Sequence, residues 1–130
     1  MTSAKVAVLL IVEDDEKLCV SMQRFLVQRG YRVWVATTEA AALASLSQVH
    51  PEAAVVDLHL PDGSGFHVLE VMRDQGFNIP VILMTADDSY AARQRAQQLG
   101  VFAFLTKPVQ PFELLRQLER AVASRTMNAD

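Results

Sequence analysis

Five polar side chains stand where short apolar runs of this sequence end, and each is of a type that can take part in phosphoryl transfer. Glu13 and Asp14 follow the first run, and Asp57 follows a later one. Thr85 and Lys107 follow the last two runs. A carboxylate can act as a nucleophile, carboxylate oxygens can hold a divalent cation, and hydroxyl and ammonium groups can bind phosphoryl oxygens. Together these residue types suit phosphoryl chemistry on Asp57.

Apolar runs alternate with segments of helical spacing along the chain. The runs begin near Lys5, Arg32, Ala53, Pro80 and Val101. Between Leu18 and Leu26, apolar residues recur at intervals of three and four, which predicts an amphipathic helix packed on a sheet. Glycines at 30, 76 and 100 stand where helices should end. We therefore predict five strand-plus-helix units.

The apolar runs differ in a way that predicts their order in a sheet. The first, third and fourth are almost continuously apolar, as in strands covered on both faces, whereas the second contains Arg32 and suits an edge. Right-handed crossovers then give one α/β domain of the flavodoxin or receiver type, a doubly wound five-stranded parallel sheet of order 2-1-3-4-5. This order places the first and third strands side by side at the switch point, where such sheets bind ligands. We also predict helices near 38–47 and 89–99, the latter polar and loosely packed.

Composition excludes several classes of protein. Hydrophobic residues make up 51% of the chain and charged residues 21%, as in a globular protein, and a net charge of -3 gives no basic surface for nucleic acid. No apolar stretch approaches the about 20 residues of a membrane span, and no signal peptide is apparent. A single cysteine, Cys19, fits a reducing compartment. We expect a cytoplasmic protein that contacts neither nucleic acid nor membrane, with a domain at 1–124 and a frayed tail at 125–130.

These positions resemble the receiver domain of two-component response regulators over nearly the whole chain. The resemblance rests on Glu13-Asp14, Asp57, Thr85-Ala86, Lys107-Pro108 and the loop at 61–65. It implies that a sensor histidine kinase or a histidine phosphotransfer protein phosphorylates Asp57 from a phosphohistidine. The cofactor would be Mg²⁺, for which Mn²⁺ can substitute. The protein would not be an enzyme but a phosphoacceptor switch, which catalyses only its own phosphorylation and dephosphorylation.

The resemblance also implies roles for individual residues. Asp14 and Asp57 would bind the metal directly, with the main-chain carbonyl of His59 as a third ligand. Glu13 would act on the metal through water. Lys107, preceding a cis peptide bond, would pair with a phosphoryl oxygen of the modified aspartate.

Signal transmission and partners follow from the same resemblance. Thr85 would donate its hydroxyl to a phosphoryl oxygen, and Phe104 would change rotamer when Thr85 moves. The surface of the fourth helix, fifth strand and fifth helix would then control a downstream effector or a fused output domain, or form a phosphorylation-dependent homodimer. The kinase would dock on the first helix around Lys17 and Ser21 and on the loop at 108–109.

Each position also has a purely structural explanation. Asp57 could be a turn aspartate, Thr85 the β-branched end of a strand, and Lys107 a solvated loop residue. Phe104 could be a half-buried aromatic of an edge strand. Acids at a helix start are favoured by the helix dipole, and we assign Asp15-Glu16 to that role.

Two other functions are compatible with this fold class. A receiver-like interaction module could work by docking alone, without phosphorylation, but the joint presence of Asp57, Thr85 and Lys107 favours the switch. A flavodoxin-like cofactor binder would need a phosphate-binding loop after the first strand, where this sequence has Glu13-Asp14. The switch is therefore the preferred hypothesis.

Overall fold

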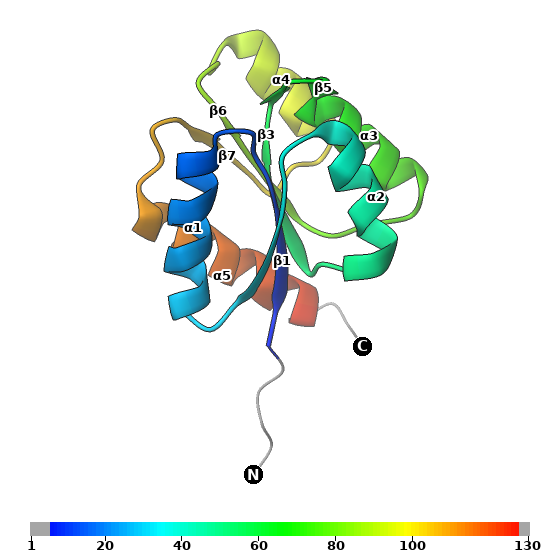
Figure 1. Ribbon diagram of the computed structural model, residues 1–130. Helices are drawn as coiled ribbons and strands as arrows, with labels where there is room; N and C mark the ends of the chain where they lie inside the picture. Colours follow the sequence, from blue (N-terminus) through cyan, green and yellow to red (C-terminus); the bar gives the residue numbers. More distant parts are fainter. Residues whose placement is uncertain (1–5, 128–130) are drawn as a thin grey trace.

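The computed structural model describes residues 6–127, which form a parallel sheet between two layers of helices (Figure 1). The main sheet has five strands in the order β2-β1-β3-β6-β7, and every neighbouring pair is parallel. Its strands are β1 (Val8–Val12), β2 (Arg32–Ala36), β3 (Ala53–Asp57), β6 (Val81–Thr85) and β7 (Ala103–Thr106). The predicted fold class and strand order are confirmed.

Helices follow each of these strands, as predicted. They are α1 (Glu16–Gln28), α2 (Glu39–Val49), α3 (Gly65–Asp74), α4 (Tyr90–Gln98) and α5 (Pro111–Met127). Figure 1 shows α1 and α5 on one side of the sheet and α2 and α3 on the other. The helix α5 includes residues 125–127, which the sequence analysis assigned to the tail, and Asn128–Asp130 lie outside the described residues. The domain boundary itself stays a prediction.

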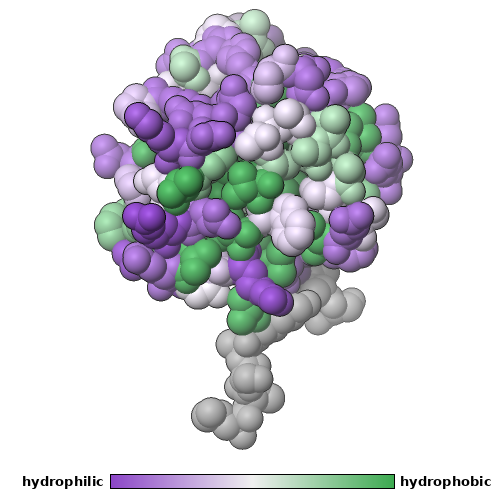
Figure 2. Space-filling model, in the orientation of Figure 1, coloured by the Kyte–Doolittle hydropathy of each residue, from purple (hydrophilic) through white to green (hydrophobic). Residues whose placement is uncertain are grey.

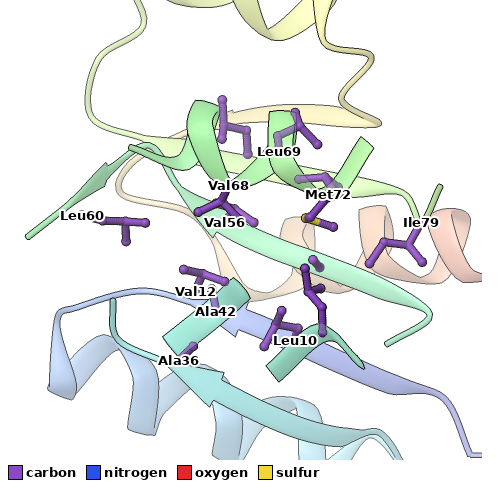
Figure 3. Close-up of a cluster of buried hydrophobic side chains, with 14 of the residues drawn as sticks. Leu10, Val12, Ala36, Ala42, Val56, Leu60, Val68, Leu69, Met72 and Ile79 are labelled. Atoms are coloured by element: carbon purple, nitrogen blue, oxygen red, sulfur yellow. The ribbon is translucent and has the colours of Figure 1, made fainter. Parts of the chain in front are cut away.

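The alternation of side chains along the central strands builds two separate cores. Leu9 and Ile11 of β1 pack in the cluster beneath α1 and α5, together with Leu26 and Leu118. Leu10 and Val12 point to the opposite face, where the cluster also contains residues of α2, α3 and α4 (Figure 3). Strands β3 and β6 alternate in the same way, so the three central strands are buried on both faces. Burial on both faces explains why the sequence of each of these strands is a continuous apolar run.

The strand β2 forms one edge of the sheet, as its charged residue predicts. Its burial alternates along the strand, and Trp34 is 53% exposed. In the orientation of Figure 1, hydrophobic residues gather in the middle of the visible face, around the place where β2 crosses between α1 and α2 (Figure 2). Within residues 6–127, no helix combines the length and the apolar character that crossing a membrane requires.

Local sequence signals explain where the helices begin and end. The side chains of Asp15, Thr38, Ser64 and Ser89 each accept a hydrogen bond from a backbone N–H in the first turn that follows. Glycines at 30, 76 and 100 have φ values of 95°, 87° and 72°, so the predicted helix-ending glycines are confirmed. Only two residues of α4, both alanines, are buried, which agrees with the loose packing predicted for it.

A small hairpin that the sequence does not predict lies directly after β3. Its strands are β4 (His59–Leu60) and β5 (Gly63–Ser64), paired antiparallel. Two-residue strands carry no periodic pattern, so this segment could be predicted only as a loop. Directly after the hairpin, Gly65 opens α3 against β3, and a Cβ at this position would collide with the carbonyl oxygen of Asp57. Glycine is therefore required for this close approach.

Candidate functional site

Three acidic side chains converge where β1 and β3 end. The sheet order puts the carboxyl ends of these two strands side by side, so Glu13 and Asp14 lie next to Asp57. One carboxylate oxygen from each of the three residues falls within 4.8 Å of the others. This is the neighbourhood that the sequence analysis expected from the switch point.

Lys107 lies between two of these carboxylates. From the loop after β7, its Nζ donates hydrogen bonds to Glu13 Oε1 at 2.7 Å and to Asp57 Oδ2 at 2.9 Å. Burial by itself lowers the pKa of Lys107, but the hydrogen bonds to the two carboxylates and their negative charges together outweigh it, and the pKa is raised. The ammonium is therefore firmly charged. The cis Lys107–Pro108 peptide bond that the resemblance implies is confirmed.

Glu13 is fully buried, which a simple helix-start acid would not be. Its Oε1 accepts from Lys107, and its Oε2 accepts from the backbone N–H of Asp15 at 3.1 Å. Burial raises the pKa of Glu13, the two hydrogen bonds lower it, and the neighbouring charge of Asp57 raises it further, so the net shift is upward. The buried carboxylate faces the site, whereas Asp15 and Glu16 lie at the start of α1 as expected, with Asp15 as its cap.

Asp57 is 5% exposed and held from two sides. Its Oδ1 accepts from the backbone N–H of His59 at 3.2 Å, while Lys107 donates to Oδ2. The oxygen atoms of this site suit a hard divalent cation, because Mg²⁺ prefers oxygen ligands. The negative charge of the three carboxylates also exceeds the positive charge of the single ammonium. The residues present therefore fit a magnesium ion.

Thr85 and Phe104 lie on the neighbouring strands β6 and β7, and β6 pairs with β3, which ends in Asp57. The buried Thr85 hydroxyl accepts a hydrogen bond from the backbone N–H of Asp87 at 2.9 Å, and the Thr85 carbonyl accepts from Lys107 N–H at 2.8 Å. Phe104 is half-buried against the core, and the guanidinium of Arg93 lies 4.6 Å from its ring centroid. Arg93 also donates to the hydroxyl of Thr106 at 3.3 Å. This arginine ties α4 to the end of β7, a contact that the sequence does not indicate.

The remaining candidates stay apart from the cluster or contribute indirectly. Cys19 is buried, and its Sγ donates to the Glu13 carbonyl at 3.0 Å. Burial and the nearby carboxylates raise the pKa of this thiol to about 11, so it is an unreactive neighbour. The histidines at 50, 59 and 67 end α2, enter β4 and lie in α3, respectively, and they do not form a metal-binding group within the described chain.

A groove lies between α1 and the loop that precedes α5. It is mostly apolar, and its lining includes Leu18, Ser21, Phe25, Pro108 and Val109. Lys107 reaches its edge, so the groove adjoins the acidic cluster. It could bind an apolar segment close to the site.

Comparison with known proteins gives a consistent result. The profile described as "Response regulator receiver domain" matches residues 9–119. The response regulator MprA of Mycobacterium avium (strain 104) is 33% identical over 122 residues, which are 94% of this chain and 53% of that protein. The chain therefore spans about half the length of the curated relatives it matches.

Solved structures of receiver domains are also similar to this chain. The non-phosphorylated HemR receiver domain from Leptospira biflexa is 34% identical, with a TM-score of 0.84 over 89% of this chain and 94% of that chain. A CheY-like response regulator receiver domain protein from Methanospirillum hungatei JF-1 is 27% identical, with a TM-score of 0.91 over 95% and 99%.

Proposed function

The chain belongs to the response regulator receiver domain family, and we propose that it is a phosphoacceptor switch modified on Asp57. The observation that carries this proposal is the buried Asp57 carboxylate, held by Lys107 beside two further acids at the switch point of the sheet. An Asp57 oxygen bonds to phosphorus while the N–P bond of a phosphohistidine breaks, which leaves an acyl phosphate on the protein. The donor is a sensor histidine kinase or a histidine phosphotransfer protein.

The chain's own residues prepare Asp57 for this transfer. Asp14, Asp57 and the main-chain carbonyl of His59 would hold Mg²⁺, with Glu13 acting through water. When bound, the ion neutralises charge on the phosphoryl oxygens, and Mn²⁺ can substitute. Lys107 already contacts the carboxylate that is modified, so its ammonium has only to turn from Asp57 Oδ2 to a phosphoryl oxygen.

Thr85 and Phe104 transmit the modification to the surface. The phosphoryl group offers three strong acceptor oxygens, and Thr85 leaves the N–H of Asp87 to donate its hydroxyl to one of them. That movement opens space for Phe104, whose ring then leaves the guanidinium of Arg93. The helix α4, held by few buried residues, shifts in response.

Two separate surfaces of the chain bind its partners. The apolar groove suits the kinase or phosphotransfer protein, because it is lined by Ser21, by the loop at 108–109 and by Lys107, which contacts Asp57. The surface of α4, β7 and α5 acts on a downstream effector or a fused output domain, or pairs with a second copy after phosphorylation. The chain works in the cytoplasm, makes no direct contact with nucleic acid or membrane, and catalyses only its own phosphorylation and dephosphorylation.

The test of this function is uptake of phosphate from a small donor. With Mg²⁺ and acetyl phosphate, the protein should gain one acid-stable, base-labile phosphoryl group, detected by intact-mass spectrometry. If neither acetyl phosphate nor a panel of histidine kinases gives an adduct, the protein is a docking module that works without phosphorylation.

The metal site makes a separate prediction. Mg²⁺ should raise the thermal midpoint of unfolding, because it binds the folded state alone. Asp14→Asn should raise the metal-free midpoint by a few degrees, since it removes one of three like charges within 4.8 Å, and it should abolish most of the Mg²⁺ effect. Differential scanning fluorimetry measures both.

Asp15→Asn is the matched control for this experiment. It removes a neighbouring charge but keeps an oxygen that can cap α1, so Mg²⁺ should still stabilise it. A metal-free Asp14→Asn protein no more stable than the unaltered protein would count against the repulsive acidic cluster.

Thr85→Ala should separate phosphorylation from its structural consequence. The variant should still accept phosphate on Asp57, but the amides around Phe104 and in α4 should not shift, because the hydroxyl that moves is gone. Amide NMR with and without beryllofluoride, a stable phosphoryl mimic, measures this, and Thr85→Ser should restore the shifts. Equal shifts around Phe104 in Thr85→Ala and the unaltered protein would show that the switch bypasses this threonine.

A further inference from the structure

The hairpin after β3 is fastened to the start of α2. Asp62, in the turn between β4 and β5, accepts hydrogen bonds from the backbone N–H groups of Glu39 at 2.7 Å and Ala40 at 3.1 Å. These hydrogen bonds lower the pKa of Asp62. The helix already has its own cap, since Thr38 accepts from Ala41 N–H at 3.0 Å. Asp62 therefore accepts from two N–H groups of the first turn that Thr38 does not reach, and it does so from a distant loop.

Glu39 makes the reciprocal contact from α2 to the hairpin. Its Oε1 accepts from the backbone N–H of Ser64 at 3.2 Å, and its Oε2 lies 2.9 Å from His67 Nδ1. Only 15% of this side chain is exposed. A Cβ on Gly63 would collide with Glu39 Oε1, so the glutamate lies directly over the hairpin turn. We call Asp62 and Glu39, with these contacts, the loop brace.

The loop brace connects to the acidic cluster through a short chain of contacts. Ser64, which Glu39 holds, pairs with His59 across the hairpin. His59 in turn donates its backbone N–H to Asp57 Oδ1. The adjacent Leu60 is buried in the core beneath α2 and α3, which anchors the hairpin from its other side (Figure 3). A continuous series of contacts therefore runs from α2 to Asp57. It consists of a hydrogen bond at each end and the paired strands of the hairpin between them.

We infer that Asp62 and Glu39 are positioning residues for the metal, because they fix the hairpin that presents the main-chain carbonyl of His59. This inference rests on the proposed function, in which that carbonyl is a metal ligand. A main-chain ligand cannot be adjusted by a side-chain rotamer, so its position depends on how rigidly the loop is held. Groups that hold metal ligands in place typically change metal affinity by ten- to a hundred-fold when removed.

The decisive experiment compares two caps of the same helix. Asp62→Ala removes the cap that comes from the hairpin, and Thr38→Ala removes the cap that belongs to α2 itself. Both should lower the thermal midpoint. Only Asp62→Ala should weaken Mg²⁺ binding, by about ten-fold, and shift the amide resonance of His59. Affinity is measured by titrating Mg²⁺ into the full chain and following backbone amides by NMR.

Variants of Glu39 test the second half of the loop brace. Glu39→Ala should weaken Mg²⁺ binding by about ten-fold as well, whereas Glu39→Gln keeps an oxygen for Ser64 N–H and should restore most of the affinity. If Asp62→Ala does not fold, Asp62→Asn retains one acceptor and should show an intermediate loss.

The outcomes separate this inference from the proposed function. Mg²⁺ affinities of Asp62→Ala and Glu39→Ala equal to that of Thr38→Ala would overturn the loop brace and leave the metal site standing. A wild-type protein that binds no Mg²⁺ would overturn the metal site and the loop brace together.

Discussion

Asp57→Asn should take up no phosphoryl group from acetyl phosphate under conditions that modify the unaltered protein. An amide lacks the anionic oxygen that attacks phosphorus, so the variant loses the proposed nucleophile while the rest of the acidic cluster is kept. The fold should survive, because the amide is of similar size and can still accept from His59 N–H. Intact-mass spectrometry before and after base treatment gives the result.

Asp74→Asn provides the control for this loss. Asp74 is an exposed aspartate at the end of α3, so the variant carries the same chemical change at a site without the acidic cluster. It should be phosphorylated like the unaltered protein. A base-labile adduct on Asp57→Asn would move the phosphorylation site to another residue.

Lys107→Ala should be phosphorylated more slowly than the unaltered protein, and in the absence of metal it should also be less stable. Lys107 is the cation between the Glu13 and Asp57 side chains, which are only 1% and 7% exposed. Breaking a buried ion pair costs about 3 to 5 kcal/mol. Lys107 is 23% exposed and Glu13 can take up a proton, so we expect the free energy of unfolding to fall by about 1 to 3 kcal/mol. Urea denaturation without metal measures this change.

Mg²⁺ should recover part of the stability that Lys107→Ala loses, because it supplies positive charge to the same carboxylates. Lys17→Ala, at an exposed position of α1, removes an equal charge. It should leave stability nearly unchanged, and also the phosphorylation rate with acetyl phosphate, a small donor that needs no docking on α1. If Lys107→Ala matched Lys17→Ala in metal-free stability, the lysine would not be the main compensation for the buried acids.

The fold could be predicted from the sequence because its signals are local. The continuous apolar runs of β1, β3 and β6 reflect burial on both faces, and the charge in β2 marks an edge. The spacing between Leu18 and Leu26 predicts α1, and the helices predicted near 38–47 and 89–99 are α2 and α4. Once the units are parallel and right-handed, few strand orders remain.

Part of the site could be predicted for the same reason. Glu13, Asp14 and Asp57 lie at strand ends, so the strand order alone brings them together. Their roles in metal binding and phosphorylation stay predictions. The bridge from Lys107 to Glu13, rather than to Asp57 alone, could not be anticipated, because it depends on how deeply Glu13 is buried.

The sequence by itself thus determined the five strand-plus-helix units, the edge strand and the end of the sheet at which the polar residues meet. Only the tertiary structure decided the hairpin β4–β5, the hydrogen bonds between Asp62 and α2, and the stacking of Arg93 on Phe104. The physical reason is the length of sequence over which each kind of interaction acts. Burial and helical spacing leave a period in the sequence. The strands of the hairpin are too short to show one, and the other two contacts join residues of different elements well apart along the chain. Which residues come into contact in these cases depends on the path of the folded backbone, and no local sequence pattern indicates that path.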